Sequence, residues 1–284
     1  MRRSVQVKSI AVLLLLIVTL CIWYAAIRED QRGRLTVSFL DVGQGDSIFI
    51  QAPSGRQVLI DGGPDTSVLR KLSRLMPWYD RSIDVIIPTH PDIDHVSGLV
   101  DVLARYKVSY IVHSDVEGDT PTAQALVSSI TREGTEQLIA KRGQIIDLGR
   151  GASLEVLFPD RSVAHVDTNT GCVVTRLVYG ATAFMLSCDA PQEIEDYLVQ
   201  LDGASLHSNV LKAGHHGSKT SSGPLFLGYV APEYAVFSRG CDNSYGHPTP
   251  EVVARFAQFG IPTSDTCTDG TITFVSDGQT VRRD

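Results

Sequence analysis

The sequence has no internal repeat, no low-complexity tract and little cysteine, with only five Cys among its 284 residues. This excludes a disulfide-built scaffold, because such small secreted domains are dense in cysteine. Aromatic residues make up 7% and charged residues 20% of the chain, whereas 43% is hydrophobic. That much apolar side chain also excludes an intrinsically disordered or collagen-like protein. One folded domain of roughly 200 to 250 residues fits this length.

The chain also lacks a basic region beyond its first 34 residues. Its formal net charge is −7, from 25 Lys and Arg against 32 Asp and Glu. Six of those cations and two of those anions precede residue 35, which leaves 19 against 30 and a net charge of −11. Undirected binding to the phosphate backbone of nucleic acids needs clustered Lys and Arg. Any nucleic-acid contact is therefore expected to be local or metal-mediated.

One long hydrophobic run lies near the amino end, at residues 10–27. It contains no charged residue, and at about 1.5 Å per residue a helix of this length spans most of the hydrocarbon core of a bilayer. A basic segment, residues 1–9, precedes it, and Trp23 and Tyr24 lie where interfacial aromatic residues are common. The run predicts a membrane anchor or a signal sequence. The bulky residues at the cleavage position favour an uncleaved anchor.

The expected order is a basic tail at 1–9, the anchor or signal sequence at 10–27, a linker at 28–34 and a hydrolase domain at 35–284. A short basic tail before a large domain usually leaves the tail inside the cell and the domain outside. We therefore expect a single-pass membrane protein with an extracytoplasmic domain. Cys241 and Cys267 fall near loops, and they could form one disulfide if the domain is exported.

The globular part combines many short strand-like runs with a few helical segments. Most strand-like runs are β-branched or aromatic and are bounded by Gly, Pro, Asp or Asn. The predicted strands are residues 35–40, 47–51, 57–60, 83–88, 108–112, 154–157, 173–179, 182–186, 209–213, 234–238 and 271–275. The predicted helices are residues 66–75, 96–106, 121–131, 191–201 and 250–259. This pattern predicts two sheets with helices outside them.

The strongest candidate site follows the predicted strand at 83–88. Two imidazoles and two carboxylates, from His90, Asp92, Asp94 and His95, lie within six residues on one strand-to-helix turn. Nitrogen and oxygen ligands of this kind suit a divalent metal. Clustered carboxylates repel one another unless a cation neutralises them. The alternative is a solvated acidic loop in which the Asp residues cap the helix.

Three later strand ends carry further candidates. Asp189 follows the strand at 182–186, where it could bridge two cations or cap the next helix. The adjacent His215 and His216 follow another strand and point different ways, so one can ligate a metal while the other faces substrate. His247 lies in a loop beyond the strand at 234–238. Because four strand ends deliver an acid or an imidazole, one shared metal site is the simplest interpretation.

These motifs, in this order, resemble the metallo-β-lactamase-like domain of the DNA-uptake competence protein family ComEC. The resemblance extends from residue 35 to about residue 275. The matching segments are Phe39–Ser47, Leu59–Gly63, His90–His95, Asp189, His215–Ser218 and Tyr245–Pro248. The resemblance implies an αββα four-layer sandwich with one or two divalent metal ions, Zn²⁺ or Mn²⁺, and hydrolysis of phosphodiesters. Because the channel region of the competence proteins is missing, we expect a stand-alone, membrane-tethered hydrolase domain.

The resemblance also implies a role for individual residues. The implied metal ligands are His90, Asp92, Asp94, His95, Asp189 and one of His215 and His216. The implied catalytic residues are Asp94, His215 and His247. Residues implied to support the ligands or contact substrate are Asp41, Asp46, Asp61, Asn169, Ser218 and Lys219. Superfamily members more usually carry His at the positions of Asp92 and Asn169, so this site is more anionic.

The expected function is a phosphodiesterase or DNase that works outside the membrane through a metal-bound hydroxide. A divalent ion lowers the pKa of bound water to near 7 and offsets the anions that meet at phosphorus. Lys212, Lys219 and Arg239 could hold the phosphate, or could be solvated loop charges. One alternative is a phosphocholine-type esterase or another small-substrate metallohydrolase. The further alternative is a non-catalytic, metal-stabilised binding module. The expected contacts are a phosphodiester, with DNA as the candidate, and the membrane; no protein partner can be inferred.

Overall fold

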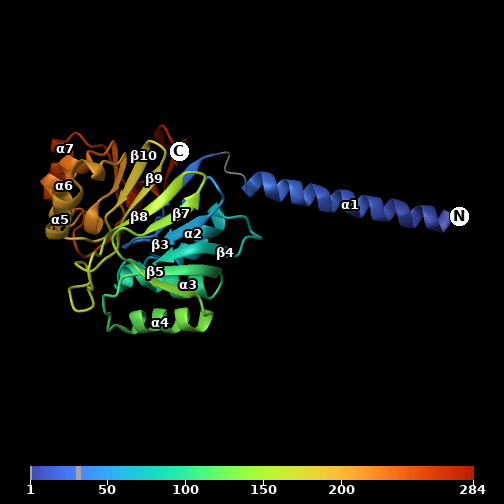
Figure 1. Ribbon diagram of the computed structural model, residues 1–284, viewed down its shortest axis with the longest axis horizontal. Helices are drawn as coiled ribbons and strands as arrows, with labels where there is room; N and C mark the ends of the chain where they lie inside the picture. Colours follow the sequence, from blue (N-terminus) through green and yellow to red (C-terminus); the bar gives the residue numbers. More distant parts are fainter. Residues whose placement is uncertain (1, 30–32) are drawn as a thin grey trace.

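The computed structural model describes residues 2–29 and 33–284, which form one long helix and a two-sheet domain (Figure 1). The helix, α1, covers Arg2–Glu29 and projects away from the domain. Its stretch Gln6–Tyr24 has a mean hydropathy of 2.3, is not buried against the domain, and is long and apolar enough to cross a membrane. The predicted hydrophobic run at 10–27 lies within this helix.

The first sheet has eight strands in the order β15-β14-β1-β2-β3-β4-β5-β6. Its strands are β1 (Leu35–Phe39), β2 (Ile48–Gln51), β3 (Gln57–Ile60), β4 (Ser82–Ile87), β5 (Lys107–His113), β6 (Glu136–Ile139), β14 (Ile272–Ser276) and β15 (Val281–Arg283). Strands β3 to β6 are parallel, and the other pairs are antiparallel. The helices on its outer side are α2 (Ser67–Leu75), α3 (Ile93–Leu103) and α4 (Pro121–Glu133).

The second sheet has seven strands in the order β13-β12-β11-β10-β9-β8-β7. Its strands are β7 (Ile145–Gly149), β8 (Ala152–Phe158), β9 (Val174–Tyr179), β10 (Thr182–Leu186), β11 (Val210–Lys212), β12 (Tyr234–Phe237) and β13 (Thr263–Asp265). Strands β10 to β13 are parallel. The helices that follow these strands are α5 (Gln192–Asp202), α6 (Pro224–Val230), α7 (Pro250–Gln258) and the short α8 (Thr266–Asp269), with 3-10 turns at Gly203–Leu206 and Gly214–Gly217.

The two sheets pack face to face around a central core of buried aromatic and aliphatic side chains. Phe39 and Phe184 meet Phe274 edge to face, with ring centroids 6.1 and 6.5 Å apart. A second buried cluster lies under α2, α3 and α4, and a third lies under α5, α6 and α7. Burial of a Phe or Leu side chain contributes roughly 1.5–3 kcal/mol. Three apolar cores between four layers confirm the predicted αββα sandwich.

All eleven predicted strands and all five predicted helices of the domain are present, but several short elements were missed. Strands β6 and β13 consist of four and three residues with few β-branched side chains, and β6 is exposed along its length. Helix α6 has seven residues and includes Gly228, which lowers helix propensity. These elements form through pairing and packing with neighbours rather than through their own sequence pattern.

Strand direction places the predicted site and the start of β1 at opposite edges of the domain. Strands β3, β4, β10, β11 and β12 all end at one edge, which carries the predicted site. Strand β1 is antiparallel to β2, and β2 is antiparallel to β3, so β1 starts at the other edge. The Tyr179 hydroxyl donates to the Gly33 carbonyl at 2.7 Å just before β1. The chain that follows α1 therefore enters the domain at the edge opposite the site.

Candidate metal centre

The turn between β4 and α3 carries the first group of site residues. Asp92 is the N-cap residue of α3, but its side chain makes no capping hydrogen bond. Its Oδ2 lies 3.5 Å from His90 Nε2 instead. The simple capping alternative for Asp92 is therefore wrong, and its carboxylate faces an imidazole.

Close backbone packing fixes the start of α3 against the end of β3. A Cβ on Gly98 would lie 2.1 Å from the Gly62 carbonyl oxygen, so only glycine fits there. Gly62 N donates to His95 O at 2.7 Å, and Gly98 N donates to Gly63 O at 3.0 Å. These two bonds place His95, in the first turn of α3, beside the carboxylate of Asp61.

Asp189 contacts histidines that follow strands of both sheets. Its Oδ2 lies 3.2 Å from His95 Nε2 and 3.3 Å from His216 Nε2. His216 Nε2 is also 3.3 Å from Asp94 Oδ2. The N-cap of α5 is Pro191, so Asp189 does not cap that helix as the alternative supposed. Groups of three that could hold a metal include His90, His95 and Asp189, and Asp94, His95 and His216.

Polar partners behind the imidazoles orient their Nε2 atoms into the cluster. Asp61 Oδ2 lies 2.8 Å from His95 Nδ1, and Asp61 also accepts from the backbone and the hydroxyl of Thr89. His216 Nδ1 donates to the carbonyl of Ser238 at 2.8 Å. A neutral imidazole bonded through Nδ1 presents its Nε2 lone pair on the other side, as metal-binding histidines do.

The cluster fits a divalent cation because it contains buried atoms that have no hydrogen-bond partner. These are Nε2 of His90, Nε2 of His216 and Oδ1 of Asp46. Buried polar atoms in native proteins are normally hydrogen-bonded, and an orphan costs roughly 1–3 kcal/mol. A cation held by His90, His95 and Asp189, or one held by Asp46, Asp189 and His216, would offer partners to buried atoms of this kind.

One buried lysine lies among the carboxylates of the cluster. Lys212 Nζ lies 2.5 Å from Asp46 Oδ2 and 3.1 Å from Asp189 Oδ1, and it donates to the Cys188 carbonyl. Burial alone would raise the pKa of Asp189, but His216 and Lys212 hold it well below its usual value. Burial would lower the pKa of His95, but Asp189 and Asp61 raise it well above its usual value.

Three aromatic side chains lead from the cluster to the surface. The His215 and His247 ring centroids are 5.6 Å apart, and Tyr245 stacks on His247 at 5.7 Å with 67% of its surface exposed. His215 Nε2 is 3.7 Å from Asp189 Oδ2, farther than His216. Burial lowers the pKa of both His215 and His247, so both are neutral near pH 7. Neutral imidazoles can accept or donate a proton.

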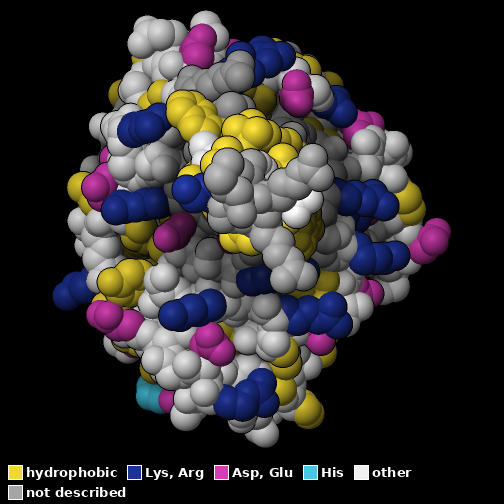
Figure 2. Space-filling model, turned by 90° about the vertical axis from the view of Figure 1, so that its right-hand side faces the viewer, with side chains coloured by type: hydrophobic (Ala, Val, Ile, Leu, Met, Phe, Trp, Pro, Cys, Tyr) yellow, Lys and Arg dark blue, Asp and Glu magenta, His cyan; other side chains and the backbone are white. Residues whose placement is uncertain are grey.

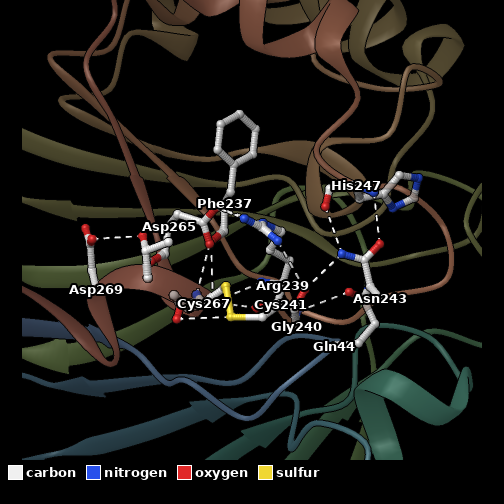
Figure 3. The surroundings of a disulfide bond; sticks show 12 residues. Gln44, Phe237, Arg239, Gly240, Cys241, Asn243, His247, Asp265, Cys267 and Asp269 are labelled. Atoms are coloured by element: carbon white, nitrogen blue, oxygen red, sulfur yellow. Dashed lines mark hydrogen bonds and ion pairs between the residues drawn. A yellow bond between two sulfur atoms is a disulfide. The ribbon is translucent and has the colours of Figure 1, made fainter.

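The disulfide Cys241–Cys267 ties the start of the loop that carries His247 to α8 (Figure 3). Its Cα atoms are 5.0 Å apart. Within the loop, the Asn243 side chain bonds to both the amide and the carbonyl of His247. Gly240 N donates to the side chain of Gln44 in the loop after β1. Loops from both sheets are thus tied together beside His247.

Four further predicted residues have other partners or surroundings. Asp41 pairs with Lys71 at 2.7 Å, and the structure gives it no contact with the clustered ligands among the described residues. The loop of Asn169 lies against the β4–α3 turn, because Val173 N donates to Thr89 O, and Asn169 Oδ1 is buried without a hydrogen-bond partner. Ser218 Oγ bonds to Thr220 Oγ1, and Lys219 is exposed.

Two cations suggested as phosphate binders have internal roles instead. Lys212 is fully buried among the carboxylates, and the Arg239 guanidinium pairs with Asp265 at 2.7 Å. Sequence reasoning also missed Thr89 and Ser238, which position His95 and His216 through Asp61 and a carbonyl oxygen. The internal role of Lys212 did leave a signal in the sequence: it lies inside the apolar strand β11, where a charged side chain requires a buried partner.

Comparisons with known proteins agree with this geometry. The profile of the Metallo-beta-lactamase superfamily matches residues 40–240. The chain is similar to ComE operon protein 3 of Bacillus subtilis, with 29% identity over 255 residues, and to Competence protein ComA of Neisseria gonorrhoeae, with 31% over 242 residues. Both alignments cover 84% of this chain and 32% of the relative, so the chain spans about a third of their length. These relatives confirm the resemblance to the competence proteins.

Among solved structures, the metallo-β-lactamase fold protein YhfI from Bacillus subtilis has the same fold. The TM-score is 0.59 at 12% sequence identity, and the match covers 86% of this chain and 99% of YhfI. At this identity the likeness concerns the fold alone.

Replacement of Lys212 by Met should strongly destabilise the domain. The change keeps an unbranched side chain but removes the ammonium group, which leaves Asp46 and Asp189 without their buried countercharge and should cost roughly 3–5 kcal/mol of unfolding free energy. Lys219→Met, at an exposed position three residues beyond the His pair, should change the unfolding free energy by less than about 0.5 kcal/mol. Urea unfolding of both variants in EDTA measures the difference. Equal stabilities would show that Lys212 does not hold the carboxylates together.

Proposed function

The chain belongs to the metallo-β-lactamase superfamily, and we propose that it is a metal-dependent phosphodiesterase that acts on DNA outside the membrane. Members of this superfamily are typically metal-dependent hydrolases. The observation that carries the proposal is the convergence of His90, His95, Asp189 and His216, whose facing atoms include two orphaned Nε2 atoms. Similarity to proteins named for competence supports DNA as the substrate class.

The proposed ligands form two overlapping groups that share His95. One is His90, His95 and Asp189, with Asp92 beside His90, and the other is Asp94, His95 and His216. Of the two adjacent histidines we assign His216 as a ligand, because its Nε2 is 3.3 Å from both Asp94 and Asp189. The nitrogen and carboxylate donors suit Zn²⁺ or Mn²⁺. A divalent ion bound there would activate water and offset the charge of a phosphodiester.

The chain's own residues would position and protonate the substrate. His215 and His247 line the exposed side of the cluster and are neutral near pH 7. Either imidazole can hydrogen-bond to a phosphoryl oxygen or pass a proton to the leaving oxygen, a contribution of roughly 10²–10⁴-fold. Lys212 and Asp61 act from behind, since they hold Asp189 and His95 in place.

Hydrolysis should depend on the ligands and on added metal. Asp94→Asn should lower metal content and reduce hydrolysis of bis-p-nitrophenyl phosphate by more than about 100-fold. Asp101→Asn, two turns later on the same helix and half-buried, should leave both unchanged. Elemental analysis and initial rates with Zn²⁺ or Mn²⁺ measure the effects. Metal content without turnover of any diester would instead favour a metal-stabilised binding module.

Tyr245 offers a reason to prefer a nucleic acid over a small diester. It is 67% exposed, and one face of its ring stacks on His247, which leaves the other face open beside the cluster. A nucleobase stacked on an aromatic side chain gains roughly 1–3 kcal/mol without sequence preference. Stacking of this kind would supply binding energy that other DNA-binding proteins obtain from clustered Lys and Arg, which this acidic domain lacks.

Tyr245→Ala should therefore raise the KM for single-stranded DNA by roughly fivefold or more. The same change should leave the rate on bis-p-nitrophenyl phosphate within about twofold, because that substrate has no chain of nucleotides to extend from the cluster to the ring. Tyr229→Ala, at a half-exposed tyrosine on α6, is the control. If the variant hydrolyses DNA and the small diester with unchanged constants, a small-substrate esterase becomes the better assignment.

We also propose that α1 anchors the protein and that the domain faces an oxidising compartment. The disulfide Cys241–Cys267 supports this orientation, because such bonds persist in extracytoplasmic proteins and are rare in the cytosol. The bond also lies near a proposed catalytic residue, since it ties the start of the loop that carries His247 to α8 (Figure 3).

The number of free cysteine thiols in cells shows whether the disulfide forms. Cells that express the full chain are denatured in polyethylene glycol-maleimide, so that each free thiol adds one label. Three of the five cysteines should react before reduction and all five should react after it, because Cys241 and Cys267 are paired. Cys241→Ser should give four labels without reduction. Five labels on the unreduced native chain would place the domain in a reducing compartment.

A further inference from the structure

One edge of the domain faces the point where α1 ends. We call it the tether edge and define it by the strand starts and turns at residues 33–34, 53–56, 76–81, 105–107, 150–151 and 277–280. These segments share an edge because β1, β3, β4, β5 and β8 start there and because β2 and β14 end there. The Ser54 hydroxyl bonds to the Leu148 carbonyl, which joins the two sheets at this edge.

The chain between α1 and the domain is too short to let the tether edge move far from the membrane. Five residues separate Glu29 from Leu35, and an extended chain spans at most about 3.6 Å per residue. The start of β1 therefore lies within roughly 20 Å of the end of α1, whatever the path of the linker. The bond from the Tyr179 hydroxyl to Gly33 fixes the domain side of this connection.

An exposed tryptophan lies on the tether edge. Trp78 is 83% exposed, in the loop at residues 76–81 that joins α2 to β4 and protrudes on the side of the domain from which α1 leaves (Figure 1). The loop is held in place, since Gln57 Nε2 donates to Asp80 Oδ2 at 2.6 Å and Asp80 N donates to Pro77 O. Trp78 also meets the Tyr79 ring at 5.8 Å. A fixed loop thus presents the indole to the surroundings.

Exposed cations flank this loop. Arg81 and Lys107 are neighbours at the starts of β4 and β5, because Lys107 N donates to Arg81 O at 2.8 Å, and Arg105 lies in the preceding turn. Figure 2, seen from the α1 side, shows Lys and Arg side chains around the helix, with Asp and Glu interspersed. This face contrasts with a domain whose net charge is −11. Lys and Arg side chains near a bilayer surface are attracted to anionic lipids.

We propose that Trp78 inserts into the interfacial layer of the bilayer that α1 crosses, with Arg81, Arg105 and Lys107 at the lipid headgroups. Tryptophan is enriched at this depth because its ring is apolar and its N–H is polar. The short tether selects the bilayer as the occupant, since the tether edge must lie near the membrane surface. The proposal rests on the anchoring role of α1, and it leaves the metal centre at the edge that faces away.

The test uses the full chain in nanodiscs of phosphatidylglycerol and phosphatidylcholine. The protein contains two tryptophans, so Trp23→Phe leaves Trp78 as the sole tryptophan, which is excited selectively at the red edge of the absorption band. Trp78 emission should shift to shorter wavelength relative to the chain in detergent solution containing no bilayer, and lipids brominated near the headgroup should quench it by at least about half. Arg105→Glu with Lys107→Glu in the same background should weaken the quenching in anionic discs.

The matched control moves the fluorophore to the other edge. Trp23→Phe, Trp78→Phe and Tyr245→Trp together place one exposed indole beside the metal centre, and brominated lipid should not quench it. Water-like, unquenched emission from Trp78 in chains that remain in the discs would overturn the docking proposal and leave the anchor and the hydrolase intact. Chains that fail to insert into discs would overturn the anchor and, with it, the docking. If the Trp23→Phe chain in discs shows the expected quenching of Trp78 but hydrolyses no diester in the presence of metal, the proposed function alone would be overturned.

Discussion

Repulsion among buried carboxylates is the constraint on which this domain depends. Asp46, Asp61 and Asp189 are almost fully buried where the two sheets meet. Positive charges from two kinds of source have to balance these carboxylates. Lys212 supplies one from within β11, and the second must come from protonated imidazoles or from a bound divalent cation. A cation is the better solution, because it would also give the orphaned nitrogen of His90 or of His216 a partner. A bound ion would thus stabilise the protein as well as supply the proposed chemistry.

Backbone strain in the same region has a similar explanation. Asp61, Cys188, His215 and His216 all have positive φ, between 45° and 57°. For residues other than glycine the left-handed conformation costs roughly 1–2 kcal/mol each. Strained residues persist where the surrounding structure over-determines them, and they cluster at functional sites. Here each one redirects the chain as it leaves a buried strand, so that Asp189 and His216 converge on the centre between the sheets.

Much of the site could be predicted from the sequence because its ligands follow strand ends, and strands of buried β-branched residues are recognisable. The motif at His90–His95 and the later Asp189 are such cases. The choice between His215 and His216 could not be predicted, since it depends on two positive φ angles. The role of Lys212 was misjudged because a strand pattern does not reveal which charges share its interior. Short strands such as β6 were missed because pairing, rather than their own pattern, defines them.

The separation of the two edges connects the tether with the chemistry. Parallel strands start at the tether edge and end at the metal centre, so a strand of five residues places the two about 17 Å apart before the loops are added. A metal centre at the tether edge would lie within reach of lipid phosphates, which would compete for a site built for phosphodiesters. At the opposite edge a bound metal ion would be open to substrates from solution, and the Tyr245 ring and the charge of that ion would have to replace the broad basic surface that the domain lacks.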